Sequence, residues 1–539
     1  MSCEARLAHW IRWVERRGVR VARRRALAIG VIGLTAFWQA AALCWLEWPV
    51  PRIHDEFSYL LAADTFAEGR LSNPTHPLWR WFETFHVIQQ PTNVSKYPPG
   101  QGLALAAGQI LTGYPIVGAW LAAAVACALV TWMLFAWVPP RWALLGGILA
   151  TVHPLILSWS HTYWGGSVAM AGGALLLGGI GRLLRYPSGG RAKIDLAAVA
   201  VGLIVLANSR PFEGLVLAVL TAPWLIQVLL RLRRSGTRLV STLLPATLAI
   251  VLGVGWMALY NHRTTGSVFR MPYMVYEATY SRTPLFYWQP VRPEPVYQHA
   301  EMERIHNEWE YGFYLDETRS WQSLAIYALK RVAYFAVYEL PGAFALLGLG
   351  ALVATPAIVR SSRPERWVPL IVAAFFASFL AETARPQGHY AAPIFALGIL
   401  YLILGLRRLR AWKPAGQRTG RLITRLMILM CVLALPWVYD DLSHPERDPE
   451  YRAQMAERAV ISNRLERMPG RHLVLVRYLP EHPAEQEWVW NRADIDNAHV
   501  VWARSGARDH KGELLAYFAG RHVWVLEPDG PAPRLRPLP

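Results

Sequence analysis

The chain has 539 residues, of which 54% are hydrophobic, 12% aromatic and only 17% charged. An ordinary soluble domain has fewer apolar and more charged residues, so this composition favours a membrane protein. The formal net charge of +18 does not indicate nucleic acid, because basic residues between apolar segments are typical of cytoplasmic loops. The four cysteines lie in the N-terminal tail or in apolar segments, which excludes a disulfide framework and a cysteine metal cluster.

The N-terminal region is predicted to lie in the cytoplasm. Residues 1–26 are rich in arginine, including the run Arg23-Arg24-Arg25, and such clusters stay on the cytoplasmic side. The apolar segment 26–50 is long enough to span, because about 20 helical residues cross the hydrocarbon core. A cleaved signal peptide is the alternative, but its apolar region is only about 7 to 15 residues long. A retained first span places Asp55 outside.

Two short helices are predicted on the outer side after the first span. From Asp55 to Gly69 apolar residues recur at helical spacing, which is typical of an amphipathic helix lying on the membrane surface. Residues 98–112 are also apolar, but about 15 residues are fewer than the roughly 17 that a span requires. We therefore expect this second helix to stay outside.

Ten further spans are predicted, which makes eleven in total. They fall near residues 115–138, 141–160, 165–184, 194–209, 211–230, 238–260, 335–358, 367–383, 389–406 and 421–439. The alternate connections at 182–193, 231–238, 360–366 and 407–425 are rich in Arg or Lys and face the cytoplasm in this arrangement. If residues 98–112 crossed the membrane, all four connections would face outward. The sequence therefore predicts an all-α polytopic bundle with its C-terminus outside.

The remaining polar segments are predicted to lie outside. They are the first outer loop (51–114), the turns 161–164, 208–213 and 385–393, and a long outer loop (261–321). Loops this long are uncommon unless they serve as lids or binding elements. The transmembrane domain is expected to cover 1–440, and 441–539 is expected to form a small periplasmic α/β domain. Its predicted elements are strands at 472–478, 500–503 and 522–526 and a helix at 513–518.

Charged residues stand directly beside apolar segments at two places in the first outer loop. His54-Asp55-Glu56 follows the first span, and Lys96-Tyr97-Pro98-Pro99-Gly100 opens the apolar segment 98–112. Charges are costly to place beside lipid, so they indicate a functional site at the outer membrane face. The pattern resembles the GT-C membrane glycosyltransferases, namely the Asp-Glu pair of protein O-mannosyltransferases and the Lys-Pro-Pro of lipid A aminoarabinose transferases.

This resemblance implies a GT-C-like enzyme that moves a sugar from a polyprenyl-phosphate donor to a lipid, glycan or protein acceptor. It makes Asp55 the catalytic base, and Glu56 the second catalytic carboxylate, about 100° around the helix. From the residues alone, an equal alternative is that Asp55 only caps the helix. A metal held by His54, Asp55 and Glu56 is not expected, because adjacent residues converge poorly on one ion. No cofactor is assigned, and the use of a divalent metal stays open.

Five residues are predicted to bind the donor phosphate: Lys96, Arg210, Arg385, His389 and Tyr390. Lys96 and the turn at His389 match the resemblance, although Tyr97 separates the lysine from its proline pair. The two arginines end spans on the outer side, and a guanidinium can bind two phosphate oxygens at once. The alternatives are interfacial anchors and, for Arg210, an ion pair with Glu213.

Four residues are predicted to contact substrate: Tyr97, His161, Tyr163 and Trp164. The last three stand where aminoarabinose transferases have a second acidic residue, which this chain lacks. Aromatic side chains stack on sugars, but they also populate membrane interfaces. In the C-terminal region, Asp494-Ile495-Asp496 is similar to a nucleotide-sugar metal motif, and we favour a structural turn there.

Two other function classes remain open. A transporter or flippase should place ionisable residues near mid-membrane, whereas here they lie at the outer boundary. A glycan polymerase or ligase would share the lipid phosphate, but it does not need an Asp-Glu pair at this position. We expect a multi-pass protein of the bacterial inner (plasma) membrane, surrounded by membrane lipid and without a nucleic-acid partner.

Overall fold

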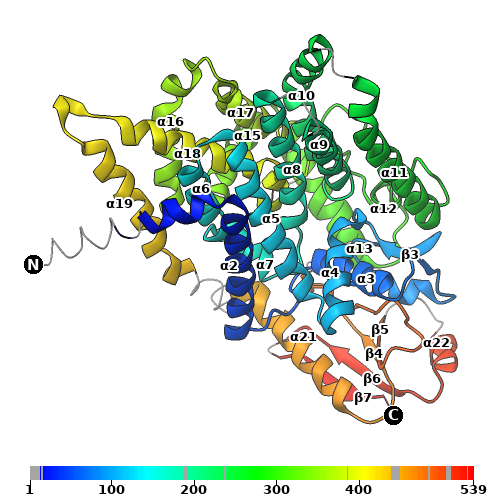
Figure 1. Ribbon diagram of the computed structural model, residues 1–539. Coiled ribbons are helices and arrows are strands. Elements are labelled where there is room, and N and C mark those ends of the chain that lie inside the picture. Colours follow the sequence, from blue (N-terminus) through cyan, green and yellow to red (C-terminus); the bar gives the residue numbers. More distant parts are fainter. Residues whose placement is uncertain are drawn as a thin grey trace, which may run out of the picture.

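The computed structural model describes residue 13 and residues 16–186, 191–235, 238–340, 342–384, 387–438, 449–483, 486–505, 511–530 and 532–538. A helical bundle forms the larger part of the molecule, and a small sheet with its helices lies at one end of it (Figure 1). The predicted combination of an all-α bundle and a C-terminal α/β region is confirmed. The predicted boundary at residue 440 falls outside the described residues.

Seven helices in these ranges are long and apolar enough to cross a membrane. Two of these spans are longer than a single helix, because one runs from Gly388 to Ala411 and the other from Thr419 to Val438. The helices are α2 (Arg25–Leu46), α5 (Ile116–Trp137), α8 (Ser167–Arg185), α10 (Pro211–Arg234), α11 (Leu239–Thr265), α18 (Phe395–Ala411) and α19 (Thr419–Leu433). An eighth span results if α6 (Pro140–Thr151) and α7 (Pro154–Ser160), bent by 54°, are taken together. The chain is therefore a multi-pass membrane protein.

The expected number of eleven spans is not confirmed, although a helix lies at each predicted position. The other three are α9 (Arg191–Ala207), α16 (Ala343–Val359) and α17 (Val368–Ser378), with 17, 17 and 11 residues. The predicted span 335–358 starts inside α15 (Trp321–Glu339) and is interrupted before α16. Gly342, in this break, has a φ of 54°, a left-handed conformation that glycine adopts at little cost.

Close packing fixes the turn η4 (Gly388–Ile394) against the bundle. A Cβ atom on Gly173, in α8, would lie 1.9 Å from the carbonyl oxygen of Pro393, so a larger residue at position 173 would push the two segments apart. The predicted phosphate-binding residues of η4 are thereby held against the bundle core.

The first outer loop packs against both the bundle and the C-terminal region. Its elements are α3 (His54–Ala67), β1 (Asn73–Pro74), η1 (Trp79–Phe82), β2 (Val87–Ile88), β3 (Thr92–Ser95) and α4 (Pro99–Thr112). The strands pair antiparallel in the order β1-β3-β2. Both predicted short helices are present, and α4 begins with Pro99, whose fixed φ suits a first helical turn.

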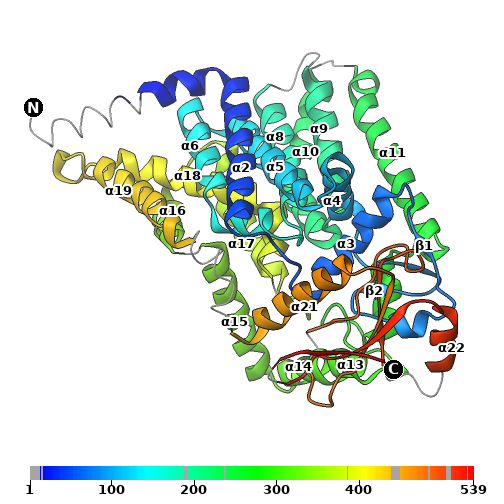
Figure 2. The ribbon, with the colours of Figure 1, turned by 90° about the horizontal axis from the view of Figure 1, so that it is seen from below.

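The expectation that α3 lies on the membrane surface is wrong, because protein covers both of its faces. Phe57 and Leu61 belong to the hydrophobic core of the C-terminal region, whereas Ala63 and Phe66 pack with α4 and α5. The apolar stripe that suggested contact with lipid is therefore buried inside the protein. Helix α21 (Pro449–Arg467) of the C-terminal region lies beside α3 (Figure 2).

The C-terminal region is an α/β unit, as predicted. It contains α21 (Pro449–Arg467), β4 (His472–Val476), β5 (Val500–Arg504), α22 (Lys511–Tyr517), β6 (His522–Glu527) and β7 (Arg534–Pro537). The strand order is β5-β4-β6-β7, with β4 parallel to both of its neighbours and β7 antiparallel to β6. The three predicted strands and the predicted helix are present, while α21 and β7 were not predicted.

The long outer loop is mostly helical. It contains α12 (Pro272–Tyr280), α13 (Ala300–Glu303), the π-helical segment η2 (Arg304–Glu310) and α14 (Tyr311–Thr318), and it leads into α15. Tyr276, Tyr280, Met302 and Ile305 pack against Phe85 and Ile88 of the first outer loop. The two outer loops therefore share one hydrophobic cluster.

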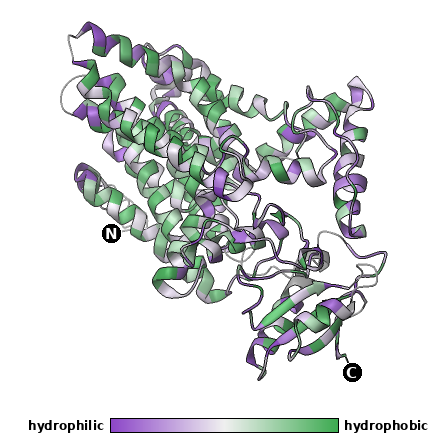
Figure 3. Ribbon diagram, turned by 90° about the vertical axis from the view of Figure 1, so that its right-hand side faces the viewer, coloured by the Kyte–Doolittle hydropathy of each residue, from purple (hydrophilic) through white to green (hydrophobic). Residues whose placement is uncertain are grey.

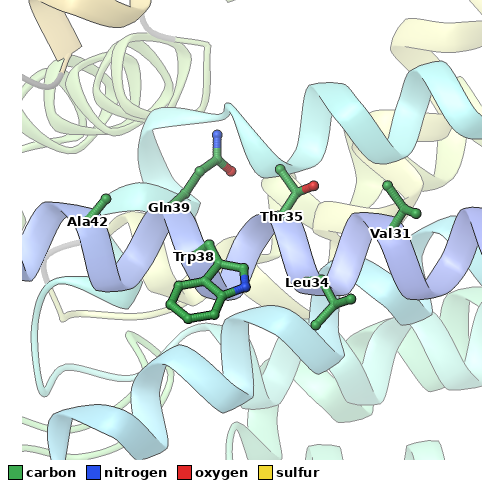
Figure 4. Close-up of a pocket in the computed structure, with 6 residues that line it drawn as sticks. All are labelled: Val31, Leu34, Thr35, Trp38, Gln39 and Ala42. Atoms are coloured by element: carbon green, nitrogen blue, oxygen red, sulfur yellow. The ribbon is translucent and has the colours of Figure 1, made fainter.

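The outer faces of the bundle are apolar, as lipid contact requires. Figure 3 shows hydrophobic residues throughout the bundle helices. On α2 the buried residues Ala28, Ile32, Ala36 and Ala40 follow at intervals of four, while Trp38 is 66% exposed. A groove of about 540 Å³ lies along this helix, lined by Val31, Leu34, Thr35, Trp38, Gln39 and Ala42 (Figure 4). None of the predicted site residues lines this groove.

Membrane orientation is a prediction that reporter fusions test. Fusions after Arg191, Arg234 and Arg410 should report the cytoplasm, because these connections carry the basic residues. Fusions near Glu301 and at the C-terminus should report the outer side. A cytoplasmic signal at Glu301 would contradict an external site on the two outer loops.

Candidate active site

Asp55 lies in the first turn of α3, where the helix dipole favours a negative charge. Its Oδ1 atom accepts a hydrogen bond from the hydroxyl of Tyr97, and Oδ2 lies 3.4 Å from His54 Nδ1 and 3.7 Å from His86 Nε2. Burial raises the pKa of the Asp55 carboxyl, but His86, His54 and Tyr97 lower it by more, to below its usual range. Asp55 is therefore ionised at neutral pH, and it joins the two motifs of the first outer loop.

Glu56 turns away from Asp55 and is bound to backbone amides. Its Oε2 accepts hydrogen bonds from the N–H groups of Arg52, at 2.7 Å, and Ile53, at 3.4 Å, and Oε1 accepts one from the N–H of Tyr163, at 3.0 Å. Glu56 therefore satisfies free N–H groups at the start of α3. The capping role considered for Asp55 belongs to Glu56.

His86 reaches Asp55 from the segment that enters strand β2. Its φ of 60° is uncommon for a residue other than glycine, and such backbone strain tends to occur at functional sites. Its carbonyl accepts hydrogen bonds from Ser58 Oγ, at 2.7 Å, and from the N–H of Lys96, at 2.9 Å. Burial and the Lys96 ammonium lower the pKa of His86, against the opposite effect of Asp55, so the imidazole is neutral at neutral pH.

His54, Asp55 and His86 form a group that fits a divalent cation. Each offers one ligand atom, and these atoms lie within 4.8 Å of one another. His54 Nδ1 and His86 Nε2 face the same oxygen, Oδ2 of Asp55, at 3.4 and 3.7 Å. Two imidazoles and a carboxylate are ligands that zinc accepts, and neutral imidazole is the form that binds metal. The adjacent residues His54 and Asp55 both belong to this group, whereas Glu56 does not, and His86 supplies the third ligand atom from a distant turn.

Lys96 lies at the end of β3, buried among aromatic rings. Its ammonium is 4.5 Å from the ring centre of Tyr276 and 5.1 Å from that of Tyr273, both in α12. Its Nζ atom donates a hydrogen bond to Oε1 of Glu277 at 3.3 Å. The ammonium therefore faces the long outer loop, and it does not project toward lipid as an interfacial anchor would.

Arg210 lies in the turn between α9 and α10 and approaches the tyrosine rings beside Asp55 and Lys96. Its guanidinium lies 4.7 Å from the ring centre of Tyr390 and 3.6 Å from Oε1 of Glu213. Tyr59 lies next to Arg210 and stacks on Tyr97, with ring centres 4.6 Å apart. A row of tyrosine rings thus connects the predicted phosphate-binding arginine to the hydroxyl that contacts Asp55. The ion pair with Glu213 that was considered as an alternative for Arg210 is present, and the phosphate-binding role stays a prediction.

The glycine of the Lys-Tyr-Pro-Pro-Gly motif brings this turn close to the first outer loop. The N–H of Gly100 donates to the carbonyl of Asn208 at 2.8 Å. A Cβ atom at position 100 would lie 2.7 Å from that carbonyl oxygen, so glycine permits the approach. The motif therefore places Lys96 and Arg210 on two segments that are bonded to each other.

The remaining predicted residues divide into two sets. Trp164 and His389 pack together, with ring centres 4.4 Å apart, next to Tyr390. Tyr163 instead donates its hydroxyl to the carbonyl of Pro49 at 3.2 Å. His161 lies 3.4 Å from Cys44 Sγ, and burial, with a smaller effect of Arg52, lowers its pKa to about 4. Tyr163 and His161 therefore have partners inside the fold.

Two further predictions concern Arg385 and the Asp494-Ile495-Asp496 motif. Arg385 lies outside the described residues. Asp494 accepts hydrogen bonds from the N–H and the side chain of Asn497, at 3.1 and 2.8 Å, and Asp496 lies 3.1 Å from His76. Asp494-Ile495-Asp496 thus forms the structural turn that we favoured over a metal motif.

Sequence patterns did not single out His86, Glu277 or Glu382. Burial and the nearby Glu213 carboxylate raise the pKa of Glu382 to about 8, although Arg210 acts in the opposite direction. Glu382 lies just after α17, and its Oε1 atom is buried without a hydrogen-bond partner among the described residues. Glu277 is 181 residues from Lys96, and Glu382 is more than a hundred residues from Arg210, so no local spacing indicates that these groups meet.

Comparisons with known proteins give matches among solved structures. No protein-family model and no curated protein sequence matches the chain. ArnT, the lipid A aminoarabinose transferase, from Cupriavidus metallidurans bound to undecaprenyl phosphate is similar, with a TM-score of 0.54 and 14% identity over 93% of this chain and 92% of that chain. Its apo structure gives a TM-score of 0.50 at 10% identity over the same shares.

An archaeal enzyme shares the architecture. The Archaeoglobus fulgidus oligosaccharyltransferase in complex with Zn and sulfate matches with a TM-score of 0.50 and 12% identity, over 93% of this chain and 67% of that chain. Both proteins are members of the GT-C family, and at this identity the similarity shows the fold. The chain thus has a GT-C fold, as the two sequence motifs predicted.

Proposed function

We propose that this chain is a membrane glycosyltransferase that transfers a sugar from a polyprenyl-phosphate donor to a hydroxyl group outside the cytoplasm. The observation that carries the proposal is the meeting of ionised Asp55 with Lys96 and Arg210, through Tyr97 and its neighbouring rings. These groups lie on outer loops of a GT-C fold. The similar ArnT structure holds undecaprenyl phosphate, which supports a polyprenyl carrier here.

The reaction that we propose breaks the bond between the sugar C1 and the phosphate oxygen and forms a bond from C1 to the acceptor oxygen. The acceptor hydroxyl loses its proton to a base, and polyprenyl phosphate leaves with the electron pair of the broken bond. The departing phosphate needs cationic or hydrogen-bonding partners. We assign this role to Lys96, Arg210, His389 and Tyr390, and we keep Arg385 from the sequence prediction.

Asp55 is the carboxylate that we assign to the acceptor. Its pKa, below the usual range, makes it a weak base but keeps it charged at any physiological pH. A charged carboxylate orients the hydroxyl and receives its proton as the bond to C1 forms. Trp164 and Tyr97 are proposed to contact the sugar, and the acceptor stays within the lipid, glycan and protein classes.

A divalent cation is compatible with the same site. His54, Asp55 and His86 would hold it, and when bound it would supply positive charge that polarises an oxygen ligand. The Archaeoglobus fulgidus neighbour was crystallised with Zn, and the convergence of two imidazoles and one carboxylate within 4.8 Å favours a cation at this group.

The transporter alternative is less consistent with the charges. Its ionisable residues should line a path near mid-membrane. Asp55, Lys96 and Glu277 instead lie on the two outer loops, outside the spans. The pair Arg182–Asp195, 4.0 Å apart, lies where α8 ends and α9 begins, which is the predicted cytoplasmic side. A cluster of charges at one end of the bundle favours chemistry at that membrane face.

Asp55→Asn should reduce sugar transfer by about 10² or more, because it removes the proton acceptor and its charge. The measurement is transfer from a synthetic polyprenyl-phosphate sugar by purified protein. The stability of this variant must be compared as well, because an ionised Asp55 with a lowered pKa also stabilises the fold at neutral pH. Glu68→Gln is the matched control, since Glu68 lies beyond the other end of α3 and pairs with Arg70 near the surface. A folded, fully active Asp55→Asn protein would contradict the assignment of this residue.

Lys96→Ala should weaken use of the lipid donor, because it removes a charge-assisted bond worth about 1.5 to 3 kcal/mol. Lys96→Arg should retain more activity than Lys96→Ala, since it keeps the positive charge. The measurement is the KM for the donor, with Lys330→Ala as the control. Lys330 also contacts a tyrosine ring, that of Tyr327 at 4.6 Å, but its side chain is exposed on α15. Equal donor KM values in all variants would make Lys96 a structural residue.

Zinc binding should require the histidines beside Asp55. We expect purified protein to retain about one Zn²⁺ per chain after dialysis, measured by elemental mass spectrometry, because the donor set suits this ion. His86→Gln and His54→Gln should each lose most of it, while His76→Gln, which alters a histidine of the same loop beside Asp496, should not. Retention of zinc by both variants would place any metal elsewhere.

A further inference from the structure

The ammonium of Lys96 already has an anionic partner in this structure. Its Nζ atom lies 3.3 Å from Oε1 of Glu277, and the two side chains are only 7% and 10% exposed. A buried ammonium group is costly unless it is paired. A carboxylate from α12 of the long outer loop therefore occupies the position that we assign to the donor phosphate.

The same carboxylate faces a second cation. Oε2 of Glu277 lies 3.7 Å from Nη1 of Arg292. This nitrogen also donates hydrogen bonds to the carbonyls of Ser281 and Thr283, so Arg292 is fixed within the loop. Lys96 and Arg292 share the one carboxylate of Glu277, so the three side chains together carry one positive charge. An anionic ligand would neutralise this charge.

The pairing of Arg210 is different in kind. Its carboxylate, Glu213, stands three residues along the same helix start, so the two groups cannot separate far. Glu277 lies 181 residues from Lys96, in another loop, and its second oxygen already faces Arg292. Its side chain can therefore leave Lys96 and keep a cationic partner.

The backbone of α12 is well anchored, which restricts the movement to the side chain. The hydroxyl of Tyr276 is 2.9 Å from His306 Nε2, and the hydroxyl of Tyr280 donates to Glu83 at 2.7 Å. Both tyrosines are buried in the cluster shared by the two outer loops. A change in the Glu277 rotamer disturbs none of these contacts, whereas displacement of the helix would break them.

We propose that Glu277 is an internal occupant of the donor-phosphate site: the arriving phosphate replaces its carboxylate on Lys96, and the carboxylate then pairs with Arg292 alone. This inference rests on the proposed function and adds a residue that sets donor affinity. One anion replaces another on the same ammonium, so the buried charge stays paired. Phosphate offers several oxygens and forms strong charge-assisted bonds, while competition from Glu277 promotes release of the lipid phosphate product.

The test is binding of undecaprenyl phosphate to the full chain in lipid nanodiscs. Glu277→Gln keeps the shape of the side chain but removes the competing charge, so the Kd should fall about fivefold or more. Arg292→Gln removes the cation that receives the carboxylate, so the Kd should rise. In the double variant the effect of Arg292→Gln should be largely lost, because no carboxylate then has to move.

Two more variants complete the design. In Glu277→Asp the side chain is shorter, so its carboxylate withdraws from Lys96 but keeps its charge. This variant should therefore also bind undecaprenyl phosphate more tightly than the wild type. It serves as the second test if the Gln variant fails to fold. Glu294→Gln is the matched control, because Glu294 pairs with Arg282 at 3.0 Å near the surface of the same loop. Its Kd should equal that of the wild type.

The outcomes separate this inference from the proposed function. The role of Glu277 would be overturned if the folded Glu277 variants bind undecaprenyl phosphate no more tightly than the wild type, or if the effects in the double variant are additive. Binding by the wild type would still support the proposed donor class. If the wild-type chain binds no undecaprenyl phosphate, both the inference and the proposed donor fail.

Discussion

Burial of α3 between the bundle and the C-terminal region is the constraint on which the outer site depends. The ring of Phe57 lies 4.2 Å from that of Trp490, and the guanidinium of Arg458 lies 4.7 Å from the same phenylalanine ring. Burial of one such side chain contributes about 1.5 to 3 kcal/mol, so the helix cannot shift without a large loss. Because Asp55 stands in its first turn, the C-terminal region helps to position a carboxylate that belongs to the bundle side of the chain.

A buried arginine extends this constraint to both outer loops. Arg504, at the end of β5, donates to the carbonyl of Glu83 at 2.8 Å and pairs with the carboxylates of Glu301, at 3.2 Å, and Glu487. Removing one partner from such a network leaves a buried charge unpaired, which is strongly destabilising. The long outer loop, which carries Glu277, is thus held against the first outer loop, which carries Lys96. This arrangement brings the Glu277 carboxylate to 3.3 Å from the Lys96 ammonium.

The sequence predicted what depends on local pattern. Apolar periodicity indicated the bundle helices and the parallel strands, and charges beside apolar segments indicated Asp55 and Lys96. It did not predict the covering of α3, because a stripe that packs on protein looks the same as one that packs on lipid. His86 escaped notice since its approach depends on a left-handed backbone conformation, and Glu277 since its partner lies in a different loop. The count of eleven spans is not confirmed, because α9 and α16 have 17 residues each and α17 has 11, whereas about 20 helical residues cross the hydrocarbon core.

The central claim is that this site transfers a sugar and does not move a lipid-linked sugar across the membrane. The most direct measurement incubates the purified wild-type chain in nanodiscs with a synthetic polyprenyl-phosphate sugar and a cell-envelope extract as the source of acceptor. Mass spectrometry then follows the lipid. We predict that polyprenyl phosphate forms and that an acceptor gains the mass of the sugar residue. Recovery of the lipid-linked sugar intact, with no glycosylated acceptor, would contradict the account.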